Sequence, residues 1–150
     1  PENENYWALN GDTYMKGAWV MHTLRSAINN DIIWFEILKE FMVENAKGHV
    51  STEDFFFKVK EKTGTDYSYF SKQYFYTENQ PHLEYYQTDN EFYYKWSNIN
   101  EDFIMPMDLL VNGLEKRVFP NQEFQVFQIS KHATIEVMDW KFYVKSIEKN

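Results

Sequence analysis

The sequence contains no cysteine, no long apolar run and no excess of basic residues. Without cysteine there are no disulfides, no thiolate metal ligands and no thiol nucleophile. Cysteine usage therefore does not indicate the cellular compartment of the protein. The apolar runs are far shorter than the roughly 20 residues that a membrane-spanning helix needs. A net charge of -8 leaves no basic stripe for phosphates or anionic lipids, so neither nucleic acid nor a membrane is an expected partner.

Several patterns typical of catalytic or metal sites are also missing. The five glycines are scattered and form no phosphate-binding loop, and no serine lies in a Gly-x-Ser-x-Gly motif. No His-Glu-x-x-His pattern occurs, and no two histidines are three or four residues apart on one helix. The histidines are His22, His49, His82 and His132. A metal site built wholly from this chain is therefore not expected.

The residues that are abundant indicate a folded protein. Apolar residues make up 43% of the 150 residues and aromatic residues 19%, which excludes a disordered chain and allows one domain or two small ones. The chain opens on Pro1 rather than methionine, and we expect it to be part of a longer protein.

Before Pro81, apolar residues recur every three or four positions, which predicts four helices. The first is expected over 14–28, capped by Asp12 or Thr13 after an irregular lead-in at 1–12. Its expected buried face consists of Ala18, Met21, Leu24 or Arg25, and Ile28. The other helices are expected over 31–46, over 51–64 with a Ser51–Asp54 capping box, and over 65–76.

After Pro81 the apolar period changes to two, which predicts strands. Seven are expected, at 82–87, 91–96, 103–111, 116–119, 123–129, 134–138 and 142–147. Asn112-Gly113 is the clearest tight-turn signal between them. The predicted fold is α+β in two segregated parts, a helical bundle over 1–80 and an antiparallel β-sandwich over 81–150.

Two groups of aromatic residues leave more than one interpretation open. The rings between Tyr67 and Tyr76 recur at helical steps and indicate core packing rather than a stacking platform. A second group could form an exposed carbohydrate-binding strip, although strand alternation directs about half of it inward. That group is Tyr85, Tyr86, Phe92, Tyr93, Tyr94 and Trp96.

The run Tyr14-Met15-Lys16-Gly17-Ala18, followed by Leu24-Arg25, closely resembles a motif of the gluzincin aminopeptidases, the zinc peptidase family of aminopeptidase N and leukotriene hydrolase. The resemblance continues through 30–35, 51–55 and 64–76, where Tyr74 stands in place of the usual tryptophan, to Pro81 and 82–85. It extends from about 13 to 86; beyond that only the β pattern agrees.

The resemblance implies that Tyr14 hydrogen-bonds the oxyanion of the tetrahedral intermediate in peptide hydrolysis, with zinc polarising the same oxygen. Lys16 and Gly17 belong to the motif, and Gly17 would suit close helix packing beneath the site. Residues 1–80 would be the C-terminal half of a thermolysin-like catalytic domain. The family's zinc ligands, general base and amine-binding motif are absent and should lie upstream of Pro1. The chain would then be the C-terminal part of a zinc metallopeptidase, inactive and without bound zinc on its own.

Two other functions stay open. The chain could belong to a non-catalytic scaffold of the same fold, or its β-sandwich could bind glycans or partner peptides through tyrosines. In the peptidase interpretation, the helices lack the catalytic half that they would pack against. We expect Trp19, Trp34 and Phe56 to be partly uncovered and to cause self-association, which sedimentation can test.

Overall fold

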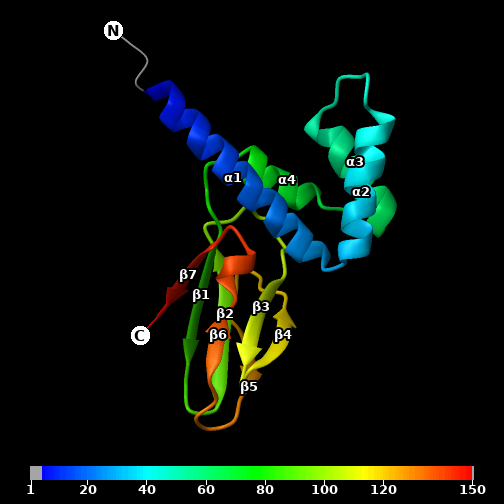
Figure 1. Cartoon of the computed structure of the whole chain (residues 1–150). Coiled ribbons are helices and arrows are strands. Elements are labelled where there is room, and N and C mark those ends of the chain that lie inside the picture. Colours follow the sequence, from blue (N-terminus) through cyan, green and yellow to red (C-terminus); the bar gives the residue numbers. More distant parts are fainter. Residues whose placement is uncertain (1–4, 150) are drawn as a thin grey trace.

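The computed structural model describes the backbone of residues 5–149 and the side chains of 14–149, with helices at one end of the molecule and two sheets at the other (Figure 1). The chain is α+β, as predicted, and its helices precede its strands. The helices are α1 (Asn5–Ile28), α2 (Asp31–Glu44), α3 (Thr52–Thr63) and α4 (Ser68–Phe75). None of these described helices is both long and apolar enough to cross a membrane.

Helix α1 begins nine residues before the predicted start. It already includes Asp12 and Thr13, so the prediction that either residue caps it is wrong. The predicted lead-in is helical from Asn5, and its first four residues lie outside the described part. The helix can extend back to Asn5 because no proline interrupts this stretch, and because Gly11 costs only about 1 kcal/mol of helix stability relative to alanine.

The buried face of α1 is also rotated from the predicted one. Its buried residues are Val20, Thr23, Leu24 and Ala27. Of the predicted face, Ala18 is exposed, and Met21 and Ile28 are only partly buried. Apolar residues surround this helix on several sides, so periodicity alone could not select the side that packs.

The predicted start of α2 and both predicted ends of α3 depend on local chemistry and are confirmed, whereas α2 ends at Glu44 with Asn45 as its C-cap rather than at 46. Asn29 closes α1 in the left-handed region with φ 54°, and the Asn30 side chain caps α2 by accepting from Ile33 N at 3.1 Å. Ser51 and Asp54 form the predicted capping box at α3, and Gly64 ends that helix with φ 71°. These short segments thus fix the end of α1, the start of α2 and both ends of α3.

Trp34 and Phe56 are buried, at 5% and 8% exposure, so the prediction that they are uncovered is wrong. The reason is that α2 packs on α3 and α3 packs on α4 within this chain. Trp19 is uncovered as predicted, with 39% exposure. Other apolar residues of α2 and α3 are exposed, namely Ile32, Phe35, Met42, Val43 and Phe57.

In the described part of the chain, seven strands form two sheets, in agreement with the predicted number. One sheet has the order β5-β2-β1-β7 and the other the order β4-β3-β6. The strands are β1 (His82–Gln87), β2 (Glu91–Ser97), β3 (Met107–Val111), β4 (Leu114–Val118), β5 (Gln125–Gln128), β6 (Ile135–Val137) and β7 (Lys145–Glu148). A short 3-10 helix, η1 (Asp139–Lys141), precedes β7.

The sheets differ from the prediction in the direction of one strand and in the bounds of several strands. β7 pairs with β1 in parallel, whereas the other pairs among the described strands are antiparallel. A long connection separates β1 from β7, so no hairpin dictates their relative direction. β3 starts at Met107 rather than at 103, because Pro106 has no N–H to donate to a ladder. The Asn112-Gly113 turn is confirmed, with φ 52° and 79° as a type I′ turn requires.

The aromatic residues of β2 alternate in burial. Phe92, Tyr94 and Trp96 are buried, while Tyr86 and Tyr93 stack on each other with ring centroids 4.5 Å apart. Half of the group is therefore in the core, as strand alternation predicts, while Tyr85, Tyr86 and Tyr93 are partly buried.

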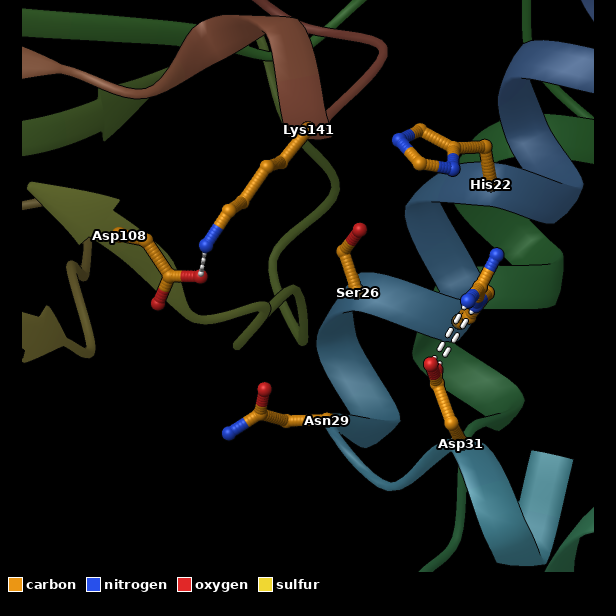
Figure 2. A pocket seen from close by; sticks show the side chains of 7 residues that line it. His22, Ser26, Asn29, Asp31, Asp108 and Lys141 are labelled. Carbon is orange, nitrogen blue, oxygen red and sulfur yellow. Dashed lines mark hydrogen bonds and ion pairs between the residues drawn. The ribbon is translucent and has the colours of Figure 1, made fainter.

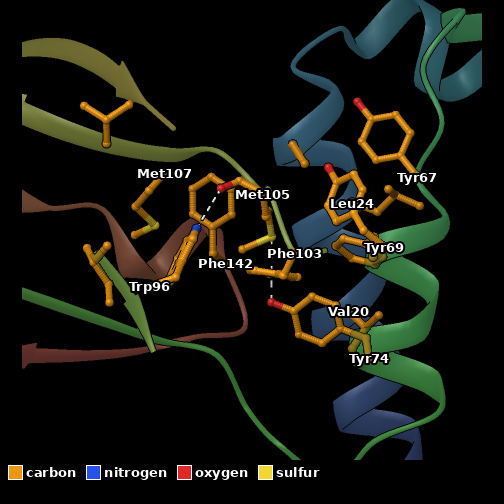
Figure 3. Packing of buried hydrophobic residues seen from close by; sticks show 14 of the residues in the cluster. Val20, Leu24, Tyr67, Tyr69, Tyr74, Trp96, Phe103, Met105, Met107 and Phe142 are labelled. Carbon is orange, nitrogen blue, oxygen red and sulfur yellow. Dashed lines mark hydrogen bonds between the residues drawn. The ribbon is translucent and has the colours of Figure 1, made fainter. Parts of the chain in front are cut away.

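One hydrophobic cluster joins the helices to both sheets (Figure 3). Val20 and Leu24 of α1 meet the α4 rings of Tyr69 and Tyr74 on the helical side of this cluster. On the sheet side, Trp96 is almost fully buried and donates its indole N–H to Met105 O at 2.9 Å. The proposed division at residues 80 and 81 stays a prediction.

Candidate functional site on helix α1

The tyrosine predicted to act in catalysis lies on α1 and points into solvent. Tyr14 is 78% exposed, and Lys16 two residues later is also exposed. In the part of the chain that the structure describes, no three His, Asp or Glu side chains converge in a way that could hold a metal ion. Among the described side chains, Tyr14 therefore has no metal ligand set beside it.

The space beside Gly17 is open. A Cβ added there would meet no described atom within 4 Å, and the residue lies inside α1. The described residues therefore make no close contact at Gly17, and the expectation that it permits close helix packing beneath the site stays a prediction. The element that would approach it is not among the described residues.

Gly17→Ala is expected to stabilise this chain by about 1 kcal/mol, because alanine restricts the unfolded chain and favours helix at no steric cost. Thermal unfolding should show a midpoint about 2–4 °C higher. Gly64→Ala is the matched control and should destabilise, because Gly64 has a φ of 71°. A lower unfolding midpoint for Gly17→Ala than for the parent chain would contradict the prediction and would mean that the isolated chain folds less stably with a Cβ at this position.

A second apolar stripe of α1 faces away from the core. Its residues line a shallow apolar hollow of about 230 Å³ and are Met15, Ala18, Trp19 and His22. The ring of His22 meets that of Trp19 edge to face, with centroids 5.9 Å apart. Apolar residues that stay uncovered at helical spacing are typical of a surface that another element covers.

A polar cleft of about 310 Å³ lies where the end of α1 meets the sheets (Figure 2). Arg25 donates to both carboxylate oxygens of Asp31, at 2.8 and 2.7 Å, and this bonding holds the pKa of Asp31 below its usual range. Across the cleft, Lys141 lies 3.4 Å from Asp108. Each charged side chain that lines the cleft in the described part of the chain is thus paired with another one.

A separate cluster of charged residues joins α2 to α3. Lys58 is buried and pairs with Glu44 and Glu61, each at 2.9 Å. Hydrogen bonds to Glu61 and then Glu44 raise the pKa of Lys58. Its ammonium is therefore a structural cation between α2 and α3, not a base.

Two α4 residues that carry the sequence resemblance join the helices to the sheets. The Tyr74 hydroxyl donates to Tyr143 O at 3.0 Å, and burial raises the pKa of Tyr74 well above its ordinary value. Gln73 is fully buried; it donates to Asn79 O and accepts from Asn100 N, both at 2.7 Å. The motif around 70–76 therefore has a structural use within this chain.

Sequence reasoning missed the polar cleft. Its side chains come from α1, α2, β3 and η1, so they share no spacing or motif. The only sequence signal is the separation of Arg25 and Asp31 across a tight helix–helix connection, and that separation does not indicate an ion pair by itself.

No family model and no curated protein matches this chain. Among solved structures, the fold is similar to the crystal structure of Legionella pneumophila aminopeptidase A in complex with aspartic acid, with a TM-score of 0.74 at 18% sequence identity. The match covers 91% of this chain and 18% of the aminopeptidase chain. This chain therefore has the fold of part of an aminopeptidase and spans less than a fifth of that protein's length.

Proposed function

We propose that this chain is the C-terminal part of a gluzincin-type zinc metallopeptidase, of the aminopeptidase kind, and that it contributes Tyr14 to the active site. The observation that carries the proposal is the fold likeness, which includes nearly all of this chain but only 18% of an aminopeptidase. The run from Tyr14 to Ala18 supports it, because it resembles the peptidase motif and lies on a helix, α1, as the sequence predicts.

Two features of α1 suit a site completed by another part of the protein. The Tyr14 phenol is free to face a substrate, and the outward stripe of Met15, Ala18 and Trp19 lies one to five residues farther along the helix. A catalytic half that packs on this stripe would approach the open side of Gly17 and exclude water around Tyr14. Exclusion of water strengthens a hydrogen bond to a developing oxyanion.

The role of Tyr14 is to donate its phenolic hydrogen to the oxyanion that forms when the scissile carbonyl is attacked. The described residues do not fit a zinc ion, since no three candidate ligands converge. Zinc and the general base would thus be held by residues outside this chain, and the peptide substrate would bind between the two parts.

An assay with zinc and aminoacyl-amide substrates tests the proposal. We expect zinc-dependent hydrolysis by the full-length polypeptide that contains this chain, and no turnover by residues 1–150 alone. A full-length polypeptide that neither binds zinc nor hydrolyses peptides would contradict the proposal and would favour a scaffold. Turnover by the isolated chain that disappears in Tyr14→Phe would contradict its predicted inactivity.

A further inference from the structure

The last turn of α1 is held by an arginine of the sheet. Arg117 lies in β4, and its Nη2 and Nη1 donate to Ser26 O at 2.7 Å and to Ala27 O at 3.2 Å. These carbonyls are among the last four of the helix, which have no partner within it. The guanidinium also brings positive charge to the negative end of the helix dipole.

Arg117 is itself fixed by a buried carboxylate. Asp108 of β3 accepts from Arg117 Nε at 2.7 Å and from Nη2 at 3.0 Å, and its side chain is only 6% exposed. A planar guanidinium held in this two-point geometry has little freedom to rotate. Asp108 and Lys141 face Ser26 across the cleft in Figure 2, so α1 meets the sheet at a fixed point.

A second contact fixes the same helix one turn earlier. The Thr23 hydroxyl accepts from Tyr143 N at 2.6 Å and donates to Trp19 O at 2.8 Å. Thr23 is fully buried, as is its neighbour Leu24 in the shared core. The C-terminal half of α1 is therefore attached to the sheets, whereas the half with Tyr14 extends beyond the contacts made by Thr23 and Arg117.

We propose that Arg117 is a positioning residue for Tyr14: through its bonds to Asp108 and to the last turn of α1, it sets the direction of the helix that presents the tyrosine. The inference rests on the proposed function of Tyr14. The β3–β4 hairpin thereby acts on the active site from a distance, without touching substrate.

Helix geometry makes the position of Tyr14 sensitive to this anchor. Tyr14 precedes Ser26 by twelve residues, which is roughly 18 Å of helix. A tilt of about 5° at the anchored end would move Tyr14 by about 1.5 Å. Displacements of about 1 Å in an active site can lower the rate on the order of 10²-fold.

The absence of cysteine allows a direct test in this chain. Spin labels on Lys16→Cys and Glu136→Cys, both exposed, report the distance between the Tyr14 end of α1 and β6. Arg117→Lys keeps a charge near Asp108, but one ammonium cannot reproduce two fixed bonds to the helix. We expect the measured distance distribution to broaden or shift, with helical content by circular dichroism unchanged.

Arg25→Lys is the matched control. It makes the same chemical change on α1 and removes a two-point pair with Asp31, but among the described residues Arg25 bonds Asp31 of α2 and not the sheets. Its distance distribution should stay that of the parent chain. An unchanged distribution in Arg117→Lys, or an equal change in Arg25→Lys, would overturn the proposal.

In the full-length polypeptide, Arg117→Lys should lower kcat roughly 10- to 100-fold with little change in KM. A shifted distance with normal kcat, in an enzyme that Tyr14→Phe does impair, would overturn the catalytic consequence. If Tyr14→Phe has no effect, the proposed function fails, and the distance measurement alone decides whether Arg117 orients α1.

Discussion

Tyr14→Phe in the proposed full-length enzyme is expected to lower kcat by roughly 10²–10³-fold, with a much smaller change in KM. Phenylalanine keeps the ring and removes the hydroxyl hydrogen that would stabilise the oxyanion. The ground-state carbonyl carries less charge than the oxyanion, so the lost bond matters most in the transition state. Steady-state kinetics on aminoacyl-amide substrates measure both constants.

The substitution should leave folding intact, because Tyr14 is 78% exposed and its hydroxyl is not needed for packing. Tyr76→Phe is a suitable control: Tyr76 is 62% exposed and its hydroxyl bonds Glu53, far along the chain from the motif. It should leave kcat unchanged. A near-normal kcat for Tyr14→Phe would refute the assigned role, whatever activity the enzyme has.

The parts of the fold that local chemistry decides could be predicted from the sequence. The Asn29-Asn30 connection, the Ser51–Asp54 capping box and the Asn112-Gly113 turn each satisfy backbone groups with residues only a few positions away. Their positions therefore divide the chain into the observed helices and strands.

The features that sequence reasoning got wrong depend on distant parts of the chain. Apolar residues lie on the side of α1 that carries Val20 and also on the side that carries Ala18. The contact with α4 and the sheets decides which of these two sides is buried. β7 runs parallel to β1 because of its path after η1, which no turn motif encodes. Burial of Trp34 depends on α2 packing within this chain.

The candidate site divides in the same way. Tyr14 could be singled out because its motif is continuous in sequence, although its exposure gives no independent evidence of chemistry. The contact between Arg117 and Ser26 joins residues 91 positions apart and could not be predicted. Residues that act on a site through tertiary contacts leave no pattern in a single sequence.

The second large effect is expected at Gln73, where Gln73→Leu should lower the free energy of unfolding by roughly 2–4 kcal/mol. Leucine has a similar size but can neither donate to Asn79 O nor accept from Asn100 N. Each of these groups would lose its partner at a site that the glutamine fills, and an unsatisfied buried group costs roughly 1–3 kcal/mol.

The two bonds of Gln73 also join α4 to the segments on either side of β1 and β2, so their loss should loosen the connection between helices and sheets. The thermal midpoint should fall by roughly 5–15 °C. Gln122→Leu, at an exposed glutamine whose hydrogen bond to Glu101 O is 3.5 Å long, should change stability by no more than about 0.5 kcal/mol. Equal midpoints for the two variants would mean that Asn79 O and Asn100 N find other partners, and that Gln73 is not what holds α4 to the sheets.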